Sequence, residues 1–61
     1  MQYNGFEIET VPSSSPSLGN IFYVRVNGIQ QIDYLRNRGD FQTEAKAIEF
    51  AQNLIDTNNL D

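Results

Sequence analysis

The residue types that most often carry chemistry are sparse in this 61-residue chain, which offers mainly carboxylates and arginines. It contains no Cys and no His, so the commonest strong nucleophile and the commonest general base are both missing. The usual zinc ligands and any disulfide are missing with them. Glu7 and Glu9 alternate along one expected strand and are typical of a solvated face. We therefore predict a protein that is not an enzyme and has no catalytic residues, metal or cofactor.

The glycine and charge patterns point away from nucleotides and nucleic acids. Gly5, Gly19, Gly28 and Gly39 are isolated, so they form no Gly-rich phosphate loop. Four Lys and Arg stand against eight Asp and Glu, a net charge of −4. Because nucleic-acid binding rests largely on cations that neutralise phosphates, this balance argues against such a partner. Arg38-Gly39-Asp40 spells the tripeptide that cell-adhesion receptors recognise, but a turn before a helix explains its Gly and Asp.

Length and hydropathy bound the class of the protein. Sixty-one residues form one domain at most, and a domain this short is marginally stable. No apolar stretch approaches the roughly 20 residues that span a bilayer. The first residues also lack the basic start and the apolar run of a signal peptide. We expect a cytoplasmic protein without membrane contact.

Three segments have the composition of strands. Residues 3–11 alternate apolar and polar side chains, which predicts a strand with one buried face. Residues 11–20 hold both prolines and four serines and predict a mobile loop. Residues 21–26 are β-branched and aromatic and predict a central strand. Asn27-Gly28 then signals a hairpin, with residues 29–35 as its return strand.

Two registers are open for this hairpin. A two-residue turn pairs Val26 with Ile29 and Val24 with Gln31, which sets apolar residues beside polar ones. A three-residue turn with a bulge at Gly28 pairs Phe22 with Ile32 and keeps each face uniform. Because a one-residue slip moves every side chain to the other face, we expect the burial pattern to select the bulged turn.

Residues 43–56 carry the signals of a helix. Thr43 is suited to the N-cap, and Glu44 complements the positive end of the helix dipole. Asn58 and Asn59 are suited to end the helix in left-handed conformations. One apolar stripe runs along this helix and is formed by Ala47, Ile48, Ala51, Leu54 and Ile55.

The fold class that follows is α+β, a three-stranded antiparallel sheet followed by one C-terminal α-helix packed on one face (β-β-β-α). The single domain is expected to cover residues 1–56, with residues 57–61 as a frayed tail.

The sheet face away from the helix is the best candidate for a function. An open face with aromatic and β-branched groups is typical of a contact surface for a protein partner or for self-association. The side chains expected there are Ile21, Tyr23, Arg25, Gln31, Asp33 and Leu35.

Residues 21–56 also resemble a known architecture. The strand Tyr-Val-Arg-Val, Asn27-Gly28 and the run G-D-F-x-T-x-x-x-A-x-x-F-A from Gly39 to Ala51 are similar to the arm-binding N-terminal domain of tyrosine integrases. Plant ethylene-response-factor domains and a small bacterial tandem-repeat domain of unknown function share the plan. The resemblance implies, as an alternative, a DNA-binding domain that places its sheet in the major groove. The residues that would carry DNA binding are Tyr23, Arg25, Arg36 and Arg38.

Overall fold

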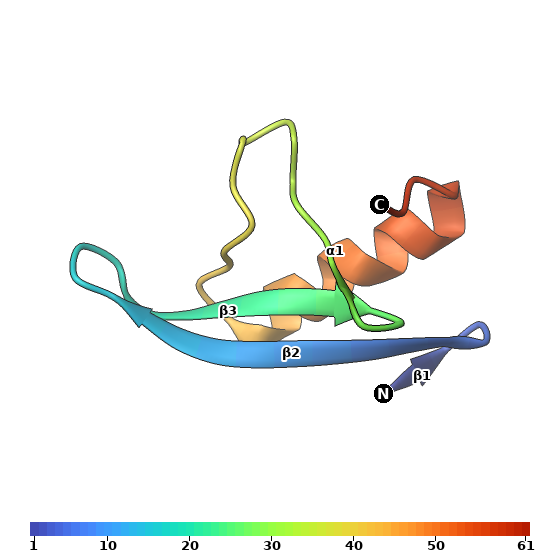
Figure 1. Cartoon of the computed structure of the whole chain (residues 1–61), viewed down its shortest axis with the longest axis horizontal. Coiled ribbons are helices and arrows are strands. Elements are labelled where there is room, and N and C mark those ends of the chain that lie inside the picture. Colours follow the sequence, from blue (N-terminus) through green and yellow to red (C-terminus); the bar gives the residue numbers. More distant parts are fainter.

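A computed structural model describes residues 1–61 as one antiparallel sheet with a single helix on one side (Figure 1). The sheet has four strands in the order β1-β2-β3-β4. The bounds are Gln2–Tyr3 for β1, Phe6–Ser15 for β2, Gly19–Val26 for β3, Ile29–Gln30 for β4 and Glu44–Thr57 for α1. The α+β class and the C-terminal helix are confirmed, whereas the expected count of three strands is wrong.

The additional strand arises from a second Asn-Gly turn at the start of the chain. Asn4 and Gly5 have φ values of 48° and 82°, and Tyr3 pairs with Phe6 across them. Two consecutive left-handed residues form the turn whose twist suits a two-residue hairpin, and Asn-Gly is the dipeptide that enters it most readily. The sequence therefore contained this hairpin signal, in the same form as at Asn27-Gly28.

The long central hairpin replaces the loop that the Pro- and Ser-rich composition predicts for residues 11–20. The pairing of β2 with β3 runs without interruption from Ile8–Val26 to Ser15–Gly19. Ile8 exchanges both backbone hydrogen bonds with Met1 on the outer side of β2, at 2.7 and 2.6 Å. Because hydrogen-bonding sides alternate along an antiparallel strand, Pro12 also directs its backbone outward. Its missing N–H interrupts no pairing with β3, so the strand tolerates it.

The hairpin from β3 to β4 has the two-residue turn, not the bulged one. Val26 pairs with Ile29 and Arg25 with Gln30, and the amide of Gln31 donates to Val24 O at 3.0 Å. Gln31 thus lies beside Val24 on the helix side and is only 1% exposed. Its side-chain amide donates to Ile29 O at 3.1 Å and accepts from the amide of Asp61 at 2.8 Å. These two bonds satisfy the polar group that the sequence pattern would have placed in solvent.

Residues 32–40 leave the sheet and return to it, and we call them the 32–40 excursion. β4 ends at Gln30, so the expected strand through residue 35 is wrong. Asp33 and Arg38 exchange backbone hydrogen bonds at 2.8 and 3.1 Å, and Phe41 then bonds both ways to Phe22 at 2.8 Å. In Figure 1 the excursion rises from the edge of β3 and comes down again before α1.

The helix begins and ends where its capping residues predict. Thr43 accepts a hydrogen bond from the amide of Lys46 at 3.1 Å, and Asn58 ends the helix with a φ of 58°. The segment after the helix is docked rather than free, since Leu60 packs against the core.

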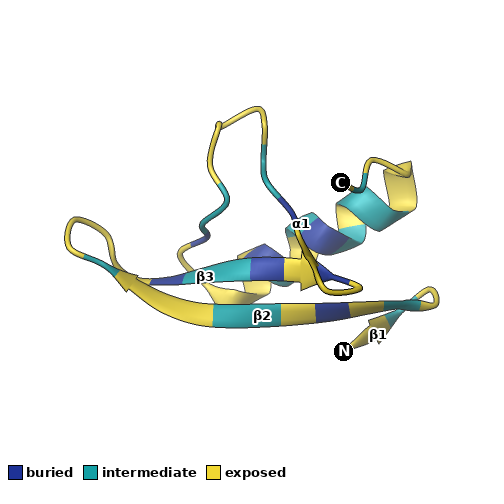
Figure 2. Ribbon diagram, in the orientation of Figure 1, coloured by how far each residue is buried: buried dark blue, intermediate teal, exposed yellow.

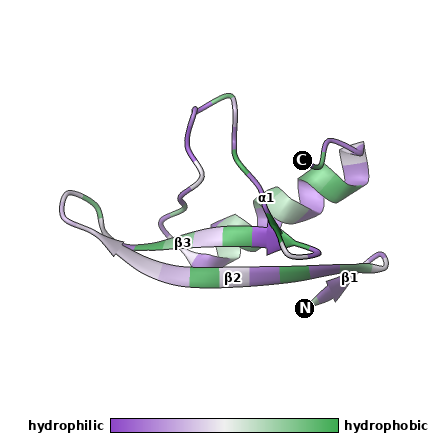
Figure 3. Ribbon diagram, viewed as in Figure 1, coloured by the Kyte–Doolittle hydropathy of each residue, from purple (hydrophilic) through white to green (hydrophobic).

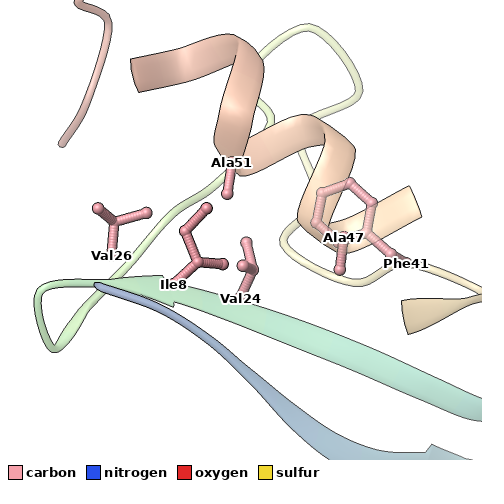
Figure 4. Packing of buried hydrophobic residues seen from close by; sticks show 6 residues of the cluster. All are labelled: Ile8, Val24, Val26, Phe41, Ala47 and Ala51. Carbon is pink, nitrogen blue, oxygen red and sulfur yellow. The ribbon is translucent and has the colours of Figure 1, made fainter. Parts of the chain in front are cut away.

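A small core lies between the sheet and α1 (Figures 2 and 4). Ala47 and Ala51 are fully buried and let the helix approach the strands closely, while Ile48 and Ile55 pack around them. Leu54 is only half buried and lies outside this cluster, although the stripe predicts it as a core residue. The buried cluster consists of Ile8, Val24, Val26, Phe41, Ala47 and Ala51.

Candidate functional site

The sheet face away from α1 has no helix or strand lying over it. Bands of differing hydropathy follow one another along β2 and β3 (Figure 3), and successive side chains of a strand point to opposite faces of the sheet. Because Val24 and Val26 point to the helix, Tyr23 and Arg25 point away from it. Val11 pairs with Tyr23 and Glu9 with Arg25, and Gln30 adjoins Arg25 on β4. We call these five residues, Glu9, Val11, Tyr23, Arg25 and Gln30, the open face.

Only part of the predicted contact surface lies on this face. Tyr23 and Arg25 are there, with Tyr23 half buried and Arg25 exposed. Ile21 follows the same alternation but is 4% exposed, so it contributes packing rather than contact area. Gln31 lies on the helix side because of the two-residue turn. Asp33 and Leu35 belong to the 32–40 excursion, where Leu35 is 100% exposed.

Each arginine of the chain lies close to a carboxylate. Arg25 and Glu9 approach to 3.8 Å across the open face. The other two pairs are within the 32–40 excursion. Arg36 donates to Asp33 at 2.8 Å, and Arg38 donates to both carboxylate oxygens of Asp40 at 2.9 and 2.8 Å.

These pairs hold the excursion in place. Arg36 also donates to the backbone oxygen of Asp40 at 2.9 Å and lies 4.7 Å over the ring of Phe41. The hydrogen bond from Arg36 holds the pKa of Asp33 below its usual value, and the bond from Arg38 does the same for Asp40. The arginines proposed for DNA contact thus have carboxylate partners within the protein. In Arg38-Gly39-Asp40, the arginine and the aspartate form an ion pair with each other.

A cleft lies beside the excursion and was not foreseen from the sequence. It has a volume of about 470 Å³, and its walls come from the excursion, the outer side of α1 and Leu18 of the β2–β3 turn. Among its lining residues are Arg36, Arg38 and Lys46, so we call it the basic cleft. A second hollow on the other side of the helix carries Glu7, Glu9 and Glu44. The separation of basic side chains in one hollow from glutamates in the other depends on how the 32–40 excursion folds back. The spacing of these residues along the chain does not reveal it.

No helix of this chain has the length and apolar character needed to cross a membrane. Comparisons with known protein families, with curated proteins and with solved structures found no match.

Proposed function

We propose that this chain is a small non-enzymatic interaction module, which binds a protein partner or a second copy of itself through the open face. The observation that carries the proposal is that a helix covers only one of the two faces of the sheet. α1 packs over Val24 and Ile8, and no helix or strand lies on the side of Tyr23.

The composition of the open face supports a protein contact. Tyr23 and Val11 sit side by side on adjacent strands and give the face an apolar centre. Polar side chains lie beside this centre: the positive charge of Arg25, the negative charge of Glu9 and the neutral amide of Gln30. An aromatic centre inside a polar rim is the usual layout of a protein contact, in which Tyr and Arg are enriched.

The alternative of DNA binding has less support. Arg25 shares its surroundings with Glu9, and Arg36 and Arg38 are held by Asp33 and Asp40. A phosphate would have to compete with these carboxylates for each guanidinium. Affinity for duplex DNA would then come from few released counterions.

A paired capture experiment tests the proposal. Tagged Tyr23→Ser and Tyr34→Ser variants are used as baits in extracts of the source cells, beside the unaltered chain. Tyr34 is an exposed tyrosine of the 32–40 excursion and serves as the matched control. We expect a partner, or the untagged chain itself, to be recovered with the unaltered and Tyr34→Ser baits and lost with Tyr23→Ser. Equal recovery with both variants, or none with any bait, would count against the open face.

A further inference from the structure

The basic cleft gathers most of the positive charge of an acidic protein. Arg36, Arg38 and Lys46 all line it, and they are three of only four basic side chains in a chain of net charge −4. Asp40 and Glu49 are the two carboxylates among its lining residues, and Asp33 pairs with Arg36 from outside the lining. Its volume of about 470 Å³ lies within the range of small-molecule pockets.

Lys46 is the cation in this cleft that is free to bind a ligand. Arg25, Arg36 and Arg38 each lie within ion-pair distance of a carboxylate, whereas Lys46 has no such partner. Lys46 also belongs to the first turn of α1, where the helix dipole adds positive potential. An anion at its ammonium group would therefore displace no existing ion pair.

Apolar surface lies in the same cleft. Phe50 is half buried, and its ring lies 5.0 Å from that of Phe41 in a tilted pair. Leu18 also lines the cleft and is 38% exposed. Gln42 and Asn53 supply neutral hydrogen-bonding groups to its lining.

We propose that the basic cleft binds a small organic anion, which places a carboxylate or phosphate on Lys46 and a flat apolar ring against Phe50 and Leu18. The cation attracts the charged end, and the aromatic wall removes the ring from water. The bidentate pair of Arg38 with Asp40 keeps the wall of the cleft in position. The acidic hollow across the helix is lined by three glutamates, and its one cation, the N-terminal ammonium of Met1, is already paired with Glu7 at 2.9 Å.

Three related probes test the two halves of this proposal separately. Benzoate carries both the ring and the charge, benzamide only the ring, and acetate only the charge. Amide shifts of ¹⁵N-labelled protein are followed as each probe is added. We expect benzoate to bind in the millimolar range, about fivefold more tightly than either of the others, with shifts centred on Gln42, Lys46 and Phe50. Equal affinity for benzamide, or no benzoate shifts around the cleft, would overturn the proposal.

A matched pair of charge variants assigns the effect to Lys46. Lys46→Gln is expected to weaken benzoate binding about tenfold, because the charge-assisted contact is lost. Lys46→Arg should retain most of the affinity. Arg25→Gln removes the same charge from the one basic residue outside the cleft and should leave the affinity unchanged. Both sites are exposed, so circular dichroism of the three variants is expected to show an unchanged fold. Equal weakening by Arg25→Gln and Lys46→Gln would mean that only net charge acts, which contradicts a site at Lys46.

Discussion

Replacing Gln31 by Ala should remove a large part of the stability of this fold. The change deletes two hydrogen bonds, to Ile29 O and from the amide of Asp61, at a side chain that is 1% exposed. Each such bond contributes about 1 kcal/mol net, and the lost methylene about 0.8 kcal/mol more. The free energy of unfolding should therefore fall by about 3 kcal/mol, when a domain of this size has only about 3–9 kcal/mol in total.

Urea unfolding followed by circular dichroism measures this change. Gln31→Met keeps the volume of the side chain and should lose only the hydrogen bonds, about 2 kcal/mol. Gln30→Ala alters the exposed neighbour on the same strand and should change stability by less than about 0.5 kcal/mol. If Gln31→Ala were as mild as Gln30→Ala, Gln31 would lie in solvent. That result would refute the two-residue turn and restore the bulged register.

Three further predictions concern the edge of the sheet, the ion pairs and nucleic acid. Pro12→Thr restores an outward N–H on the free edge of β2 and should raise self-association, measured by light scattering, above that of the unaltered chain. Pro16→Thr changes a proline in the turn and should not raise self-association. Equal self-association of the two variants would contradict the edge role of Pro12. The pKa of Asp40 is lowered by Arg38, so its pair contributes stability that is present above the unfolded Asp pKa of about 3.9 and lost as pH falls through the lower folded pKa. The urea midpoint of Asp40→Asn should therefore fall less than that of the unaltered chain between neutral and strongly acidic pH, and an equal fall would count against the pair. Labelled random duplex DNA should show no binding at physiological salt, and micromolar binding abolished by Arg25→Ala would favour the DNA-binding alternative.

Local signals in the sequence predicted the elements that depend on local chemistry. The helix begins after Thr43 and ends at Asn58 because a side-chain cap and a left-handed residue act within one turn. Asn27-Gly28 predicted a hairpin for the same reason, and Asn4-Gly5 carried an equal signal for β1. Pro12 suggested a loop, yet a proline is compatible with a strand whose N–H side faces outward.

The register and the candidate sites could not be predicted because they depend on contacts between distant residues. The bulged turn was expected because it keeps apolar residues together on one face of the sheet. In the structure Gln31 lies on the buried face, where it accepts a hydrogen bond from the amide of Asp61, thirty residues away. Tyr23 and Arg25 were correctly assigned to the face away from the helix, as alternation along one strand requires. Leu35 was misplaced because β4 ends after two residues. The basic cleft depends on how the 32–40 excursion folds back, which brings Phe41 beside Phe22 from nineteen residues away.

The open face as the contact surface is tested most directly by an amide-shift map. The ¹⁵N-labelled chain is mixed with the captured partner, or with an excess of unlabelled chain if no other partner is recovered. We predict that the changes centre on Val11, Tyr23 and Arg25 and that Tyr23→Ser abolishes them. Changes confined to α1 or to the 32–40 excursion, or no changes at any concentration, would contradict the account.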